Sequence, residues 1–471
     1  MRYTILAAWV TITAGLVCPG QDSQQTAFRC LGKIRARAAV EIAASNWSVG
    51  AETMDRDYTI YRNWKSYLGP LGFKQARLQA GWAKTEKEKG IYDWAWLDEI
   101  VFDMAGQGVE PWMCLCYGNP LYADGGGTLL GAAVPRTEEA LQAWEKFVRA
   151  LAGRYGRVID EWEVWNEPNL RRNNAPEIYA EFLLRTAAAL RQVQPQARIL
   201  AMSLAGVDAK FTDQVLKIVA DKGRLDLIDE ITYHPYTFNP DQSYQAVAGL
   251  RRVVDKYSGR ITLRQGENGA PSERRNTKAL SKYDWTEVSQ AKWALRRLLG
   301  DLGRDIPSSY FSIMDMKYPD EMNRKGLLLS REDQTVERPK AAYYALQDLA
   351  AIFDDTLRRI PHYAWRTDCQ ESLAVFAYEN RFTGRQVVTI WQNGAIPSDR
   401  LEKTPLDLTF FAGDFQQPVY VDLREGRVYE VPASQWSHRG TVCEFRGIPC
   451  YDSPILIADK SLIPLSPGAG H

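Results

Sequence analysis

An alternation of strand-like and helix-like segments runs through residues 45–353 and limits the folds open to this chain. Short runs rich in β-branched and aromatic residues predict strands, and apolar residues three and four apart predict helices. The expected strands are 47–52, 73–79, 109–117, 157–166, 198–203, 227–233, 260–267 and 308–314. The expected helices are 57–68, 94–106, 137–153, 175–193, 209–222, 243–257, 284–302 and 339–352. Eight such units predict an α/β fold whose parallel sheet closes into a (β/α)8 TIM barrel.

The flanking segments have a different pattern. Residues 354–463 show period-two alternation separated by turns, which predicts a small C-terminal antiparallel β-sandwich packed on the barrel. Residues 21–44 precede the strand–helix alternation, and we expect a strand there that joins the sandwich. Residues 464–471 are rich in Pro, Gly and Ser, and we expect a disordered tail.

Residues 1–20 have the pattern of a signal peptide, with Arg2 followed by the apolar run Tyr3–Val17. That run is shorter than the ~20 residues that a membrane span needs. We therefore expect export, to a secreted or periplasmic location. A retained anchor and lipid attachment at Cys18 stay open as alternatives. No later segment of the sequence is long enough to span a bilayer.

Two predicted strands end in a glutamate. In Asp160-Glu-Trp-Glu-Val-Trp-Asn-Glu-Pro-Asn169, Pro168 cannot donate to a sheet and ends the strand just after Glu167. Leu263-Arg-Gln-Gly-Glu-Asn-Gly-Ala270 is a second strand that ends in Glu267 before a glycine loop. In a (β/α)8 barrel, reactive groups collect at the carboxyl ends of the strands. Two carboxylates there suit a retaining glycoside hydrolase, in which one acts as acid and base and the other as nucleophile.

The motif Trp162-Glu-Val-Trp-Asn-Glu-Pro-Asn169 with a later glutamate resembles the clan A glycoside hydrolases, and most closely family 39 and its relatives. The resemblance covers residues 45–350 in strand order and, more loosely, the C-terminal β region. It implies that Glu167 is the general acid/base and that Glu267 is the nucleophile. Glu163 lies deeper on the same strand, and we expect a buried structural carboxylate.

The resemblance also implies roles for four further residues. Asn166 is expected to bind the sugar 2-hydroxyl, an interaction that strengthens in the transition state. Arg77, at the end of the second strand, is expected to support the nucleophile, because a neighbouring cation keeps a carboxylate ionised; a plain ion pair in the barrel core is the alternative. His234 and Tyr236 match the clan's His-x-Tyr pair, whose tyrosine approaches the nucleophile.

Three residues at strand ends are weaker candidates for the wall of the sugar site. Trp82 follows the second strand, and Tyr117 and Asn119 follow the third. The chain departs from the clan after the eighth strand, where many members place a tryptophan under the sugar. Here Ile313-Met-Asp-Met-Lys317 contains none, and we expect Asp315 and Lys317 to supply polar contacts instead.

Composition excludes several other classes. The 58 basic and 58 acidic residues give a net charge of zero, so no basic surface predicts nucleic-acid binding. Only four histidines are present, and none clusters with cysteine, which argues against a zinc site. We expect neither a metal nor a cofactor. Cys443 and Cys450 are near enough in sequence to bridge a loop, but sequence does not fix the pairing.

The sequence therefore predicts a secreted retaining glycoside hydrolase that cleaves O-glycosidic bonds of an oligo- or polysaccharide by double displacement with two glutamates. The alternative is a catalytically idle carbohydrate-binding protein on the same barrel. A serine hydrolase is disfavoured, because the Gly-x-Ser-x-Gly elbow is missing. The sugar, its linkage, exo- or endo-action and the oligomeric state stay open.

Overall fold

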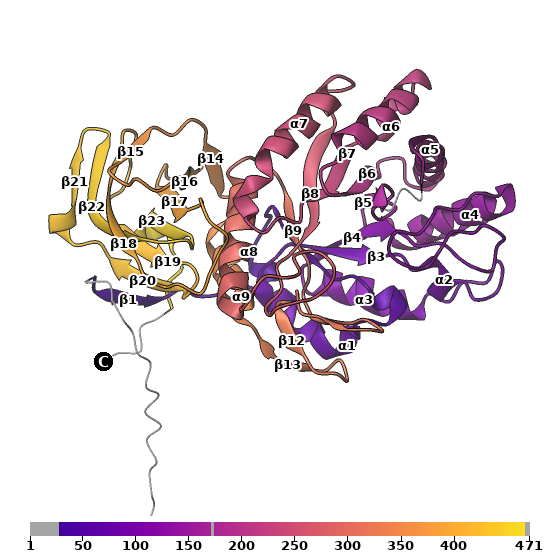
Figure 1. Cartoon of the computed structure of the whole chain (residues 1–471), viewed down its shortest axis with the longest axis horizontal. Coiled ribbons are helices and arrows are strands. Elements are labelled where there is room, and N and C mark those ends of the chain that lie inside the picture. Colours follow the sequence, from indigo (N-terminus) through magenta and orange to yellow (C-terminus); the bar gives the residue numbers. More distant parts are fainter. Residues whose placement is uncertain (1–27, 171–173, 467–471) are drawn as a thin grey trace, which may run out of the picture.

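The computed structural model describes residues 28–170 and 174–466 of the 471-residue chain. Two bodies lie side by side, a barrel of parallel strands wrapped by helices and a β-sandwich (Figure 1). The predicted signal peptide, residues 1–20, and the last part of the predicted tail, residues 467–471, lie outside the described residues.

Eight parallel strands close into a barrel in chain order, and the last pairs with the first. This confirms the predicted (β/α)8 fold. The strands are β2 (Trp47–Gly50), β3 (Gln75–Gln79), β4 (Glu110–Leu115), β5 (Glu161–Val164), β6 (Arg198–Ala205), β7 (Glu230–His234), β8 (Thr262–Asn268) and β9 (Ser308–Tyr310). The longer helices around them are α3 (Ala95–Gly106), α4 (Glu138–Tyr155), α5 (Pro176–Val193), α6 (Ala209–Asp221), α7 (Tyr244–Asp255), α8 (Glu287–Leu302) and α9 (Ala341–Ile352).

Local chemistry explains where these helices begin. The Thr137 side chain accepts a hydrogen bond from the amide of Ala140 and caps α4. Pro176 is the first residue of α5, where a missing N–H costs nothing. The Asp208 carboxylate caps α6 by accepting from the amide of Phe211. Each cap fixes the point at which the chain leaves the mouth of the barrel and turns back along its outside.

The first predicted helix, 57–68, is wrong. Only α1 (Tyr61–Trp64) is α-helical there, and the 3-10 turn Lys65–Tyr67 follows it. Asp57 has a left-handed backbone (φ 58°), which a right-handed helix does not accept. Trp64, at φ −125°, then leaves helical geometry before the chain reaches Pro70.

The predicted antiparallel sandwich is also confirmed. A seven-stranded sheet has the order β1-β20-β19-β23-β17-β16-β14, and a four-stranded sheet has the order β15-β18-β22-β21. Their strands are β1 (Cys30–Lys33), β14 (Leu357–Ile360), β15 (Trp365–Thr367), β16 (Leu373–Asn380), β17 (Gln386–Gln392), β18 (Thr404–Phe410), β19 (Pro418–Asp422), β20 (Arg427–Glu430), β21 (Trp436–Arg439), β22 (Val442–Cys450) and β23 (Ile455–Asp459).

The early segment of the chain is part of the sandwich. β1 pairs antiparallel with β20, at the edge of the seven-stranded sheet. Residues 464–466, expected to be disordered, are instead paired beside β1. Leu465 forms a bridge with Ile34, and the amide of Arg35 donates to the Pro464 carbonyl at 2.7 Å. The unpaired backbone groups beyond β1 offer these residues partners that their composition does not reveal.

The cysteines in the described part of the chain are all free. Cys443 and Cys450 lie in the same strand, β22, on different partner residues of β18. Cys114 and Cys116 follow each other along β4 and its end, with their sulfurs 3.6 Å apart. Within the same described ranges, no helix has both the length and the apolar content that crossing a bilayer requires.

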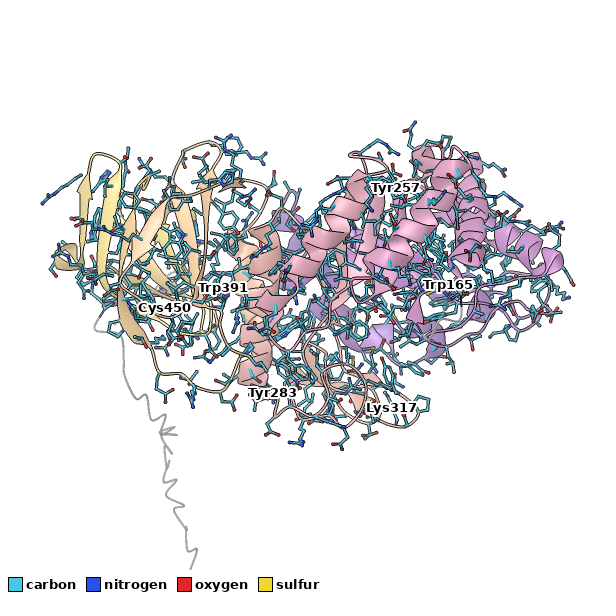
Figure 2. All side chains as sticks on the ribbon, turned by 45° about the horizontal axis from the view of Figure 1, so that its top comes forward. Trp165, Tyr257, Tyr283, Lys317, Trp391 and Cys450 are labelled. Carbon is cyan, nitrogen blue, oxygen red and sulfur yellow. The ribbon has the colours of Figure 1, made fainter. Side chains whose placement is uncertain are left out.

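Buried polar contacts join the two bodies. α8 and α9 lie at the junction (Figure 1), and Trp391 and Cys450 mark the sandwich beside it (Figure 2). Arg296 of α8 pairs with Asp241 at 2.7 Å and donates to the carbonyls of Asn393 and Ala395 in the sandwich, at 3.2 and 3.0 Å. The Trp391 indole donates to the same Asp241 at 3.1 Å. The sandwich is thus fixed to the barrel by hydrogen bonds to both members of a buried ion pair of the barrel.

We predict that Arg296→Met destabilises the protein by about 3–5 kcal/mol, because it leaves the Asp241 carboxylate buried without its cation. Chemical denaturation followed by tryptophan fluorescence measures the change. Arg358→Met is the matched control, since that arginine pairs with Glu379 on the surface, and we expect its unfolding midpoint to stay at the wild-type value. Equal midpoints for both variants would contradict the prediction.

Candidate active site

The two glutamates that end predicted strands lie at the carboxyl mouth of the barrel. Glu167 follows β5 and Glu267 is in the last part of β8. Trp165 and Glu167 both have left-handed backbones (φ 70° and 50°), so the chain turns sharply out of the strand. The amide of Glu167 is held at 2.9 Å by the carbonyl of Ser203. The two glutamate side chains keep 10% and 12% of their surface exposed, so both are almost enclosed but still reachable.

The carboxylates of Glu167 and Glu267 face each other across a short gap. One oxygen of each lies within 4.8 Å of the other, and His234 lies between them. The His234 Nδ1 is 2.9 Å from Glu167 Oε1 and 3.7 Å from Glu267 Oε2. Carboxylates that hold a water molecule between themselves and a sugar stand roughly 6.5–9.5 Å apart, whereas direct attack needs about 5–5.5 Å. The separation suits direct attack.

Arg77 of β3 lies under this pair, fully buried, and joins the strands around it. Its Nη1 donates to Glu52 Oε1 and to Glu267 Oε2, each at 2.9 Å. Its Nε donates to Glu163 at 2.9 Å, and its Nη2 donates to the same carboxylate and to Asn166 Oδ1. Arg77 thus contacts the nucleophile candidate, and Glu163 is a buried partner of the guanidinium.

Glu267 is held in its ionised form. Burial opposes the charge, but the His234 imidazole, the Arg77 guanidinium and the Tyr236 hydroxyl together hold the pKa of Glu267 below its ordinary value. The Tyr236 hydroxyl donates to Glu267 Oε1 at 2.8 Å, while Arg77 donates to the other oxygen. Both oxygens are thereby fixed in position, as a nucleophile requires.

His234 links the two glutamates to the strand between them. Its Nε2 lies 3.1 Å from the Ser203 hydroxyl of β6, and its Nδ1 faces Glu167. Burial works against a charged imidazole, but the neighbouring Glu267 and Glu167 raise the pKa of His234 above its ordinary value. The ring therefore acts as a donor toward the carboxylates.

Asn166 and Tyr117 adjoin the same network. The Asn166 amide donates to the Tyr117 hydroxyl at 3.0 Å, and its oxygen accepts from Arg77. The guanidinium of Arg56, in the loop after β2, lies 4.7 Å from the centre of the Tyr117 ring. These two predicted residues therefore lie beside Glu167, on the side of β4.

Two other predicted wall residues lie elsewhere. Trp82 is fully buried, and its ring packs on Tyr122 and Trp144 with centroids 5.4 Å from each. Asn119 is buried as well and donates to the backbone carbonyl of Glu86 at 2.8 Å. The prediction that they line a sugar site is wrong, because a short helix begins at Trp82 and turns its ring inward against α4.

The residues after the eighth strand also differ from expectation. Asp315 has no exposed surface and pairs with Lys340 at 2.6 Å, so its expected contact with a sugar is wrong. Lys317 lies at the edge of the molecule (Figure 2), where its ammonium is bound to the carbonyl oxygen and the carboxylate of Glu332. β9 ends at Tyr310, earlier than the predicted 314, so both residues lie farther beyond the end of the barrel strand than expected.

Glu52, which shares Arg77 with Glu267, is not among the predicted site residues. A signal is present in the sequence, since Glu52 ends the first strand-like segment just as Glu167 and Glu267 end theirs. Lys325 is not predicted either; it is a buried residue whose ammonium lies 5.4 Å from the centre of the Tyr236 ring. Lys325 comes from a loop far along the chain, and no motif marks it.

Glu167, His234 and Glu267 are near enough together to be compared with a metal site. The comparison fails on their partners. Both oxygens of Glu267 already accept hydrogen bonds, and one of the donors is the Arg77 guanidinium. A second cation beside that guanidinium would be repelled. The donor set fits acid–base and nucleophilic chemistry better than metal binding.

We predict that Arg77→Met destabilises the protein by about 3–5 kcal/mol at pH 7, because it leaves buried carboxylates without their cation. The pKa of Glu267 is lower in the folded protein than its ordinary value. The ionised carboxylate therefore stabilises the fold at pH values above its pKa in the unfolded chain, and this stabilisation is lost as the pH falls through its pKa in the folded protein. The difference between Arg77→Met and wild type should therefore shrink toward pH 3. Urea denaturation at a series of pH values measures it, and a difference that grows in acid would contradict the prediction.

No known sequence family and no curated protein matches the chain. Solved structures match it along most of its length. A family 39 glycoside hydrolase from the gut symbiont Bacteroides cellulosilyticus WH2 superposes with a TM-score of 0.63 at 19% identity, over 88% of this chain and 81% of the other. A family 39 β-xylosidase from Caulobacter crescentus superposes with a TM-score of 0.59 at 18% identity, over 91% of this chain and 97% of the other. A family 39 enzyme from Xanthomonas axonopodis pv. citri superposes with a TM-score of 0.58 at 19% identity, over 94% of this chain and 99% of the other. The chain therefore has the barrel-and-sandwich fold of the family 39 glycoside hydrolases.

Proposed function

We propose that the protein is a retaining glycoside hydrolase that cleaves an O-glycosidic bond by double displacement. One observation carries the proposal: Glu167 and Glu267 face each other within 4.8 Å at the carboxyl mouth of the barrel. The similarity in fold to family 39 enzymes supports the same conclusion.

In the first step, Glu267 attacks the anomeric carbon of the sugar while Glu167 gives its proton to the departing oxygen. The donors on both oxygens of Glu267 keep it ionised and aimed. In the second step, Glu167 takes a proton from water, and that water displaces Glu267 from the anomeric carbon. Each step inverts the configuration, so the product retains that of the substrate.

The neighbouring residues support the two glutamates. His234 donates toward Glu167 and steadies its charged form after the first step. Tyr236 holds Glu267 through its hydroxyl, and that hydrogen bond must weaken as Glu267 bonds to the sugar. Asn166, whose amide lies between Arg77 and Tyr117, is our candidate for binding the sugar 2-hydroxyl.

The substrate class we propose is an oligo- or polysaccharide, handled outside the cytoplasm after export directed by residues 1–20. Aryl β-xylosides belong in the first panel of substrates, because the Caulobacter protein is named a β-xylosidase. A wild type that binds sugars but releases none would instead favour the idle carbohydrate-binding protein.

We predict that Glu267→Ala lowers kcat by at least ~10³-fold while the fold stays intact, because the attacking group is gone. Hydrolysis of a panel of dinitrophenyl glycosides, followed by absorbance, measures the rate. In the wild type, an activated 2-deoxy-2-fluoro glycoside of the accepted sugar should label Glu267, which peptide mass spectrometry can locate. Labelling of another carboxylate would refute the assignment, and a first product of inverted configuration in a proton NMR time course would refute retention.

Glu167→Ala should separate substrates by their leaving groups. We expect a loss of about 10²–10⁴-fold for natural glycosides, whose leaving oxygen needs a proton. Dinitrophenyl glycosides, which leave without one, should lose much less in the first step, and added azide should restore turnover by replacing the activated water. Equal losses on both kinds of substrate, with no rescue by azide, would show that Glu167 is not the proton donor.

A further inference from the structure

A third glutamate shares the cation that holds the nucleophile. Glu52 follows β2, its side chain is 1% exposed, and its Oε1 accepts from Nη1 of Arg77 at 2.9 Å. The same Nη1 donates to Glu267 Oε2 at 2.9 Å. The two carboxylates thus divide the hydrogens of a single nitrogen. The mechanism above gives Glu52 no task.

The three carboxylates around Arg77 differ in how many hydrogen-bond donors and cations each one has. Glu163 takes two donors of the guanidinium, Nε and Nη2, and a third from the Thr232 hydroxyl. Glu267 takes Arg77, Tyr236 and the nearby His234. Among the described residues, the Glu52 carboxyl group accepts a hydrogen bond only from Nη1 of Arg77, which also donates to Glu267. Three ionised carboxylates on one buried guanidinium would leave an excess of negative charge in a place that water hardly reaches.

The groups that face Glu52 come from several strands. Arg77 on β3 and His234 on β7 are the cations, and Glu267 on β8 is a neighbouring carboxylate. In the loop that follows Glu52, Asp55 and Arg56 pair with each other at 3.2 Å. None of these cations pairs with Glu52 alone, so burial decides whether the Glu52 carboxyl group is protonated.

We propose that Glu52 is a positioning residue that is neutral while the enzyme works, and that its ionisation draws Arg77 away from Glu267 and ends turnover at alkaline pH. When Glu52 loses its proton to solvent, it becomes a full competitor for Nη1. The hydrogen bond from Arg77 to Glu267 then weakens, and a second negative charge lies beside Glu267. Both changes make the ionised nucleophile less well aimed.

The titration of Glu52 places this change on the pH scale. Burial, with the like charge of Glu267 and against the attraction of Arg77, raises the pKa of Glu52 to about 8. An acid with a raised pKa keeps its proton below that value and is charged above it. Glu52 is therefore neutral at pH 7, and the alkaline limb of activity should lie near pH 8.

This inference rests on the proposed function, and its test removes the proton donor Glu167 as a source of the alkaline limb. Dinitrophenyl glycosides need no proton from Glu167, so kcat/KM on such a substrate reports the state of the nucleophile. For the wild type, we expect kcat/KM to fall about tenfold per pH unit above about pH 8. For Glu52→Gln, which cannot ionise, the limb should move up by at least one pH unit, whatever the absolute rate.

Glu230→Gln is the matched control. Glu230 is equally buried and also pairs with a buried arginine, Arg264 at 2.8 Å, but it begins β7 at the opposite end of the barrel. Its profile should keep the wild-type limb. An unchanged limb in Glu52→Gln, or an equal movement in both variants, would overturn the proposal.

A second measurement needs no turnover and separates failure of this inference from failure of the proposed function. Difference infrared spectroscopy of the wild type between pH 7 and pH 9.5 should show the loss of a protonated carboxyl band beyond that of Asp348, whose pKa burial raises to about 7. Glu52→Gln should lack that further band, and Glu230→Gln should keep it. An inactive wild type that shows the band would refute the enzyme but not the protonated Glu52. An active wild type without it would refute the inference alone.

Discussion

The contacts of Arg77 are the interaction on which the mouth of this barrel depends. One guanidinium joins Glu52 of the first strand unit, Glu163 of β5, Asn166 beyond it and Glu267 of β8. A planar group with five donors can satisfy several acceptors at fixed angles, which an ammonium cannot do. The same contacts that favour the ionised form of Glu267, our proposed nucleophile, therefore also tie β3 to the ends of β2, β5 and β8 at the mouth of the barrel.

Much of the fold follows from pattern alone. The alternation of strands and helices arises from local patterns of apolar residues, so the sequence predicts it, and the caps at Thr137 and Asp208 and the proline at the start of α5 then set where these helices begin. The failures were those in which a distant partner decides. Residues 464–466 look like a tail until β1 is placed beside them, and the left-handed backbone at Asp57 breaks a segment whose side chains suit a helix.

The candidate site divides along the same line. Glu167 and Glu267 were accessible to sequence because proline and glycine mark the ends of their strands, and such ends converge in a barrel. Trp82 also follows a strand, yet it turns into the core, because position along the chain does not fix the direction of a side chain after the turn. Glu52 also ends a predicted strand, but only the structure shows that it shares a nitrogen of Arg77 with Glu267.

The pairing of β1 with β20 has a consequence for biosynthesis. Residues 30–33 leave the ribosome early, but their partners, residues 427–430, are made almost 400 residues later. The barrel, whose strands lie between these two segments, can close before the sandwich has all its strands. During synthesis the edge of β1 must therefore wait unpaired, and the exposed charge of Arg29 beside it is the kind of residue that keeps a waiting edge from joining a neighbouring chain.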